Sequence, residues 1–300
     1  MTRLLDSVRL YLHPNLSLSE PRVWLNSGVH QPNSSELDEL KGTSFTKDAY
    51  IPNDDWQILT EKQSKQLLAQ NRFNDYSRTV SVFSVPKNIL QPLQQLKISQ
   101  LPPTQTSVLN QAHYKEAIAP ILHHFTSYCR DRNPNLAGIG ISPPGLPTIT
   151  INQQQSIGLH LDSWDRLPLA RRHQSTNRIC INLGTDDRYF LFINLTLLDM
   201  LTVLRYDHFS AKEVERDFNN KMRWKFRKLF YKYRSNKCKA SPLALKNAFV
   251  RRYPNYPVIK VKIIPGEAYV APTENIIHDG SSLGQQHFDV QLTLRGHFRL

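Results

Sequence analysis

The part of the chain from residue 148 onward is a series of short apolar segments separated by turn signals. The segments with the length and residue types of β-strands are Thr148–Asn152, Ile157–Asp162, Arg178–Leu183, Tyr189–Leu195, Val258–Ile263, Ala268–Ala271 and Phe288–Leu294. Turn-forming residues stand between them, as in Gly184-Thr185-Asp186-Asp187 and Pro265-Gly266. Strands this short and this numerous bury their apolar faces by packing one sheet on another.

The part before residue 148 has a different character. Its first 55 residues are polar and weakly periodic, whereas Thr79–Val85 has the pattern of a strand and residues 114–130 have apolar side chains at helical spacing. We therefore predict an α+β protein. Residues 1–147 form a mixed α/β region with N-terminal helices that packs on the core, and residues 148–300 form a jelly-roll core whose mouth can hold a metal.

A basic segment interrupts the β-rich half. Ser210 and Glu213 form a capping box, and apolar residues then recur with helical spacing up to Tyr233. Between Lys212 and Arg252 there are 14 lysines and arginines against three acidic residues, so this window supplies +11 of the net charge of +13. We predict a basic helical insert at about 205–252. Its basic face either is only solvated or attracts an acidic partner.

Composition argues against several classes of protein. No stretch approaches the ~18 uncharged apolar residues typical of a membrane-spanning helix, and residues 1–7 lack the apolar core of a secretory signal. Cys129, Cys180 and Cys238 are odd in number and far apart, which favours reduced thiols over a disulfide framework or a zinc site. We expect a cytoplasmic protein that makes no membrane contact.

His160 and Asp162 lie two residues apart on a predicted strand, so their side chains should point to the same face. His278 follows far downstream, in a strand-like stretch from Tyr269 to Gly280. Two imidazoles and one carboxylate occupy half of the octahedral shell of Fe(II) and leave the other half open. The alternative is that both histidines are half-buried residues of a sandwich, bonded to backbone carbonyls. The order and spacing of the set favour the metal site.

With Arg295 on the last strand, these residues resemble the motif of the Fe(II)/2-oxoglutarate-dependent dioxygenase superfamily: His-x-Asp, a distant His and a later Arg on a double-stranded β-helix, a jelly-roll or cupin-like fold. The resemblance covers roughly residues 148–300. It implies that His160, Asp162 and His278 are the metal ligands and catalytic residues, and that Fe(II), 2-oxoglutarate and O2 are required.

A turn upstream supports the choice of the distal histidine. Relatives often enter the strand of that histidine through a Gly-acidic turn, and Pro265-Gly266-Glu267 lies about twelve residues before His278. This similarity favours His278 over His287 and His297.

The resemblance also implies a co-substrate site. Arg295 falls on the position that pairs with the far carboxylate of 2-oxoglutarate, where a planar guanidinium suits a carboxylate. The 17 residues from His278 to Arg295 exceed the usual spacing, and residues 280–284 can absorb the surplus as a loop. Thr293 shares the face of Arg295 and is a further candidate. Arg178 either approaches the co-substrate or is a charge at a strand edge.

The implied reaction is the hydroxylation of an unactivated C–H bond, with succinate and CO2 as co-products. Halogenating relatives have Gly or Ala where this chain has Asp162, so halogenation is disfavoured. We expect a small metabolite, an amino acid or a peptide-type natural product as substrate. Trp164 and Arg166 fall where relatives place substrate-facing residues. The alternative for Trp164 is an aromatic side chain that packs under a loop.

Two other functions stay open. One is a 2-oxoglutarate-dependent hydroxylase or demethylase of a macromolecule, protein or RNA, that docks on the basic insert. The other is a non-catalytic jelly-roll module that binds an acidic partner there, such as a carrier protein. Trp224 and Tyr231 among the lysines permit stacking with bases. No recognised nucleic-acid-binding motif accompanies them, so we do not expect nucleic acid as a partner.

Overall fold

The computed structural model of the chain describes residues 4–17, 19–33, 44–71, 75–98, 112–205 and 241–299. The predicted basic helix that begins at Ser210 lies outside these ranges, as does Cys238, so the acidic partner expected there stays a prediction. Cys129 and Cys180 are buried free thiols. Within the described ranges, no helix combines the length and the apolar character that crossing a membrane requires.

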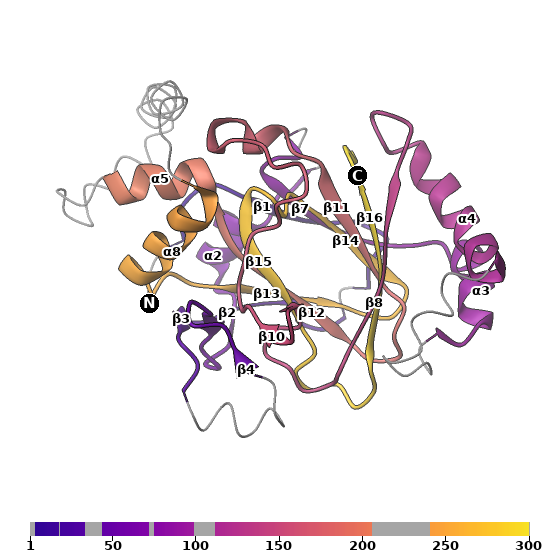
Figure 1. Cartoon of the computed structure of the whole chain (residues 1–300), viewed down its shortest axis with the longest axis horizontal. Helices are drawn as coiled ribbons and strands as arrows, with labels where there is room; N and C mark the ends of the chain where they lie inside the picture. Colours follow the sequence, from indigo (N-terminus) through magenta and orange to yellow (C-terminus); the bar gives the residue numbers. More distant parts are fainter. Residues whose placement is uncertain are drawn as a thin grey trace.

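Most of the described strands belong to two sheets of an α+β fold (Figure 1). The larger sheet has the order β1 (Arg9–Leu12), β7 (Thr79–Ser84), β14 (Glu267–Ala271), β11 (Asn177–Asn182), β16 (Asp289–Gly296) and β8 (Asn135–Ser142). The smaller has the order β15 (Ile276–Ser281), β12 (Arg188–Thr196), β13 (Ile259–Ile263), β2 (Val23–Leu25) and β6 (Gln57–Ile58). Apart from the parallel pair β1 and β7, neighbouring strands in these two sheets are antiparallel.

Shorter elements complete the described part of the chain. Two small sheets contain β4 (Ser44–Phe45), β10 (Gln155–Ser156) and β9 (Ile151–Asn152), and β3 (Val29–His30) with β5 (Ile51–Pro52). The helices are α2 (Glu61–Leu67), α3 (Lys87–Gln95), α4 (Ala112–Thr126), α5 (Leu197–Arg205), α8 (Pro242–Arg252) and a 3₁₀ helix at Leu169–Gln174.

The two larger sheets pack face to face between two helical layers. The inner core combines residues of both sheets, among them Val82, Phe190 and Tyr269. One outer core joins the larger sheet to α3 and α4, and another joins the smaller sheet to α5 and α8. Figure 1 shows these helix pairs on opposite sides of the strands. The molecule is therefore layered as helices, sheet, sheet and helices.

Alternation along each strand decides which side chains face the interior between the sheets. On β11, Ile179 and Ile181 pack toward the helices, whereas Cys180 belongs to the inner core. On β16, Leu292 and Leu294 likewise pack toward α3 and α4. Arg295 and Thr293 therefore lie on the inner face, as the alternation predicts.

Strands from both sides of residue 147 share each sheet. β1, β7 and β8 lie beside β14, β11 and β16, and β2 and β6 extend the smaller sheet from β13. The helix predicted at 114–130 is α4, and the strand predicted at Thr79–Val85 is β7. β8 was not predicted, because it is an edge strand with half-exposed residues and two glycines.

Three predicted strands differ from the structure. Of Thr148–Asn152, only Ile151–Asn152 is a strand. Residues 157–162 form an irregular extended segment, because Gly158 has a φ of +65° that breaks the strand geometry. The stretch from Tyr269 to Gly280 is two strands of different sheets, β14 and β15, and His278 lies within the second of them.

The turn at Pro265-Gly266 precedes β14 and not the strand of His278. Its acidic residue has a structural contact, since Glu267 accepts two hydrogen bonds from the guanidinium of Arg22 at 2.7 and 2.9 Å. The side chains of this pair are 5% and 3% exposed, so it is a buried ion pair that ties the N-terminal region to β14.

We expect Glu267→Ala to lower the free energy of unfolding by about 3–5 kcal/mol, because the change leaves the buried guanidinium of Arg22 without its counter-charge. Urea denaturation measures the difference. The matched control is Glu61→Ala, which breaks an ion pair with Lys65 on the exposed surface of α2 and should change the unfolding midpoint little. A loss below about 1 kcal/mol for Glu267→Ala, the range of exposed pairs, would contradict the expectation.

Candidate metal centre

The irregular segment 157–162 is joined to β15 by backbone hydrogen bonds. The amides of His160 and His278 each donate to the carbonyl of the other at 2.9 Å. The amide of Asp162 donates to the carbonyl of Thr273, in the turn before β15, at 3.1 Å. At Gly158 a Cβ would lie 2.5 Å from the carbonyl oxygen of Tyr50, so only glycine fits there. The segment therefore runs beside β15 although it is no regular strand.

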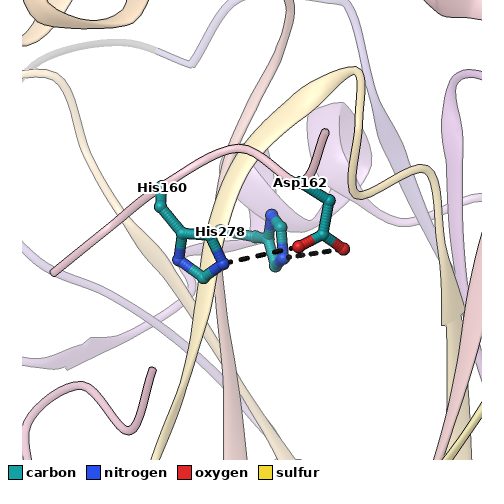
Figure 2. A group of neighbouring side chains, drawn as sticks. All are labelled: His160, Asp162 and His278. Atoms are coloured by element: carbon teal, nitrogen blue, oxygen red, sulfur yellow. Dashed lines mark ion pairs between the residues drawn. The ribbon is translucent and has the colours of Figure 1, made fainter. Parts of the chain in front are cut away.

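His160, Asp162 and His278 converge at this junction and form the candidate metal centre (Figure 2). Their ligand atoms lie within 4.8 Å of one another. Nε2 of His160 is 3.6 Å from Oδ1 of Asp162, and Nε2 of His278 is 3.8 Å from Oδ2. All three residues are buried. The structure thus brings together the three side chains that the sequence predicts as ligands.

The free atoms of these side chains fit a bound cation. The Nδ1 atoms lie 3.2 Å from backbone oxygens, of Gly158 for His160 and of Ile276 for His278, which leaves each Nε2 facing the centre. Nε2 of His278 and Oδ2 of Asp162 are buried and make no hydrogen bond. Buried polar atoms without a partner are uncommon. Two imidazoles and one carboxylate with open positions are the ligand set of non-haem Fe(II) sites.

Neighbouring charges shift the pKa values at the centre. Burial alone would lower the pKa of His160, but the carboxylates of Asp279 and Asp162 outweigh it and raise the pKa to about 9. Burial opposes ionisation of Asp162, yet Arg178 and the two imidazoles hold its pKa well below the usual range. Burial lowers the pKa of His278 strongly. In the metal-free protein the centre therefore holds one imidazolium, one carboxylate and one neutral imidazole.

Arg178 lies against the candidate metal centre. Its Nη1 is 3.3 Å from Oδ2 of Asp162, and its Nη2 donates to the hydroxyl of Tyr269 at 3.4 Å. On β11 it stands opposite Arg295 of β16. β11 lies between β14 and β16, so Arg178 is not a charge at a strand edge. Its guanidinium orients the carboxylate of Asp162, and its approach to a co-substrate stays a prediction.

Arg295 is buried but already has acidic partners. Its Nη2 donates to Glu274 at 2.8 Å and to Thr176 at 2.5 Å, and Asp165 lies 3.4 Å away. Its Nη1 makes no hydrogen bond. Thr293 pairs with Cys180 of β11 and Gly138 of β8 on the same inner face.

The residues after Asp162 form a loop that is fixed at its base. Trp164 is 61% exposed, and its ring lies 5.1 Å from the guanidinium carbon of Arg295. The backbone amides of Trp164 and Asp165 both donate to Glu274. Arg166 is exposed and has a φ of +51°. Trp164 is therefore not packed under the loop, and its ring lies over the guanidinium of Arg295.

Three buried charges near the centre were not predicted. Glu274 is fully buried and also accepts a hydrogen bond from Arg172, which bonds to the carbonyl of Asp162. Asp279 lies 3.4 Å from Nδ1 of His160. Arg188 begins β12 and faces the inner core. Extending the alternation of Phe190 and Phe192 by two residues would have placed Arg188 inside. No pattern in the sequence indicates the contacts of Glu274 and Asp279.

The other histidines of this region lie elsewhere. His287 is exposed and pairs with Asp186, and His297 pairs with Asp131. Neither belongs to the cluster of possible metal ligands among the described residues.

No protein-family model matches the chain, and no curated protein matches it. Among solved structures, the Kdo hydroxylase KdoO, a non-haem Fe(II) alpha-ketoglutarate-dependent dioxygenase, matches in its complex with cobalt(II), at 15% identity and a TM-score of 0.40. Its complex with alpha-ketoglutarate and Fe(III) matches at 16% identity and a TM-score of 0.38. Both matches cover 74% of this chain and 80% of that chain.

We expect Co(II) binding to release about one proton at pH 7.5. The metal-free protein holds a proton on His160, whose pKa is about 9, and a metal ligand must be deprotonated. The apparent affinity should therefore rise about tenfold per pH unit until pH 9. Calorimetric titration in two buffers with different ionisation enthalpies counts the protons. His287→Ala is the control and should give the same count. Binding without proton release would contradict a protonated His160 in the metal-free centre.

Proposed function

We propose that the chain is an Fe(II)/2-oxoglutarate-dependent oxygenase that hydroxylates an unactivated C–H bond. The observation that carries the proposal is the convergence of His160, Asp162 and His278 in a buried centre between two sheets, where Nε2 of His278 makes no hydrogen bond. When bound, the iron and its co-substrate supply the oxidant. The overall reaction converts substrate C–H, 2-oxoglutarate and O2 into substrate C–OH, succinate and CO2.

The strand order supports a double-stranded β-helix as the scaffold. The extended segments that follow α4 and lie in or beside the two larger sheets are, in chain order, β8, residues 157–162, β11, β12, β13, β14, β15 and β16. β14, β11, β16 and β8 are neighbours in one sheet, and β13, β12 and β15 in the other, where residue 160 bridges to β15. The chain thus passes back and forth between two facing sheets, as a jelly roll does. Such a scaffold presents a metal between its sheets.

The side chains around the centre have separate tasks in this proposal. Arg178 keeps the carboxylate of Asp162 ionised and oriented. Phe190 and Tyr269, whose rings stack at 4.0 Å, form an apolar wall next to His278. Such a wall excludes water from the buried side of the centre. Trp164, exposed on the fixed loop, and Arg166 are the candidates for substrate contact. A small metabolite, an amino acid or a peptide-type natural product remains our proposed substrate class.

Two arginines are candidates for holding the far carboxylate of 2-oxoglutarate. The sequence predicts Arg295, but its Nη2 already serves Glu274 and Thr176. The structure adds Arg188, which is 1% exposed. A Cβ at Gly280, two residues beyond His278 on β15, would lie 2.9 Å from Nη2 of Arg188. The guanidinium therefore lies against Gly280, the next residue of β15 on the same face as His278. Arg188 is also engaged, since its Nε lies 3.1 Å from Asp289 and its Nη1 donates to Cys180. Its Nη2, on the side of Gly280, is the part of the guanidinium that we propose for the co-substrate.

Anaerobic addition of Fe(II) and 2-oxoglutarate to the metal-free protein tests the function. We expect the weak visible charge-transfer band of the chelated co-substrate, and then succinate when O2 is admitted. His160→Ala, Asp162→Ala and His278→Ala should abolish both signals, because each removes a ligand. His287→Ala should retain them. Full turnover in His278→Ala would refute the site. A protein that binds Fe(II) but forms no band or succinate would instead be a non-catalytic module.

The two arginines can be distinguished by matched substitutions. We expect Arg188→Lys to raise the half-saturating concentration of 2-oxoglutarate by about tenfold or more, since an ammonium cannot form the two parallel hydrogen bonds of a guanidinium. Arg295→Lys should have a smaller effect, because Glu274 already engages that side chain. Titration of the charge-transfer band measures both without turnover. The opposite ranking would assign the co-substrate to Arg295, as the sequence predicts.

A further inference from the structure

Asp279 is a fully buried carboxylate that directly follows His278 on β15. One of its oxygens is held by two donors. Oδ1 accepts a hydrogen bond from the hydroxyl of Thr150 at 2.8 Å and another from the amide of Gly280 at 2.7 Å. The amide of Gly280 belongs to the backbone of β15, so the orientation of the carboxylate is set by the strand itself.

The other oxygen of Asp279 faces a ligand of the candidate metal centre. Oδ2 lies 3.4 Å from Nδ1 of His160 and has no hydrogen-bond partner. Nε2 of the same ring faces Asp162 on the opposite side. The ring of His160 thus lies between the carboxylate of Asp279, on its Nδ1 side, and the candidate metal position, on its Nε2 side. A fully buried carboxylate oxygen is costly unless a donor satisfies it, and Nδ1–H of His160 is the donor within reach.

We propose that Asp279 is a positioning residue that holds His160 with its proton on Nδ1 and its free Nε2 directed at the metal. The inference rests on the proposed function, because it assigns a role toward a metal that this function requires. Ligating histidines commonly donate their second nitrogen to a carboxylate or a carbonyl, which fixes the ring and strengthens the ligand. Asp279 contacts neither metal nor substrate in this arrangement. It acts through His160.

The two ligand histidines differ in how much support they need. His278 is part of a regular strand, and its Nδ1 faces the carbonyl of Ile276 on the same strand. His160 lies on the irregular segment, two residues after Gly158. The Gly158 carbonyl that faces its Nδ1 belongs to the same irregular segment. The side chain of Asp279 therefore holds the ring of His160 from β15, the same regular strand that contains His278.

Asp279→Asn separates positioning from structural support. The amide of Gly280 and the hydroxyl of Thr150 retain the oxygen of the new side chain, which turns its NH2 group toward Nδ1 of His160. A donor at that place favours the tautomer with the proton on Nε2, and this tautomer cannot bind a metal. We expect the affinity for Co(II) to fall about 10–100-fold, the range of outer-shell substitutions. Unfolding in urea should change little.

Asp279→Ala provides the decisive comparison. Alanine removes the carboxylate but introduces no donor, and the carbonyl of Gly158 can still accept from Nδ1 of His160. The Co(II) affinity should therefore rank wild type, then Asp279→Ala, then Asp279→Asn. A purely structural role predicts the reverse order of the variants, since Asn is isosteric and keeps both hydrogen bonds of Oδ1. Competition with a chromogenic chelator gives the affinities, which are compared after correction for the protons released on binding, because Asp279 also raises the pKa of His160. The visible d–d bands of bound Co(II) report the ligand geometry.

A second buried acid controls for loss of charge. Asp199 is fully buried and bonds to Thr196, at the start of α5. Asp199→Asn should lower stability and leave the Co(II) affinity unchanged.

The outcomes distinguish this inference from the proposed function. A wild-type protein that binds no Co(II) at the centre overturns both. Wild-type binding with an unchanged affinity and d–d spectrum in Asp279→Asn overturns the role of Asp279 alone. An Asp279→Asn variant that binds more tightly than Asp279→Ala also overturns it. Weaker binding in the predicted rank, with stability preserved in Asp279→Asn, supports it.

Discussion

The reciprocal pair of backbone hydrogen bonds between His160 and His278 is the interaction on which the site depends. Each amide donates to the carbonyl of the other residue at 2.9 Å. The segment that contains His160 is irregular, because Gly158 has a left-handed φ. Together with the hydrogen bond from the amide of Asp162 to the carbonyl of Thr273, this bridge fixes the segment beside β15. With it, the side chains of residues 160 and 162 stand beside that of residue 278, more than one hundred residues later in the chain.

Buried acids on both sides of the bridge complete the attachment. Asp279 faces His160 from β15. Glu274, in the turn before β15, binds the amides of the loop that follows Asp162 and the guanidinium of Arg172, which in turn bonds to the carbonyl of Asp162. β15 and the turn before it thus both support the irregular segment through buried acidic side chains. Burying a carboxylate is unfavourable unless donors satisfy it. For Glu274, the two loop amides and Arg172 are these donors.

Alternating apolar residues made the larger strands predictable. β11, β12, β13, β14 and β16 match predicted segments to within one or two residues, since apolar side chains of the inner core recur at every second position. Between them lie apolar residues of a helical layer or, in β13, two lysines. The division of the stretch 269–280 into β14 and β15 was missed because it depends on which sheet each half joins. The ligand candidates were found from residue type and order. Asp279, Glu274 and Arg188 act on them across space, and spacing in the chain does not show which distant charges meet.

Charge balance at the buried centre bears on the order in which ligands bind. In the metal-free protein, the negative charges of Asp162 and Asp279 are matched by Arg178 and by the imidazolium of His160, whose pKa is about 9. Exchanging that proton for a divalent cation leaves a net charge of about +1 in a site of low effective dielectric, where unbalanced charge is costly. An anionic ligand next to the metal removes this excess. Under the proposed function, this charge balance predicts that the metal binds first and the dicarboxylate second.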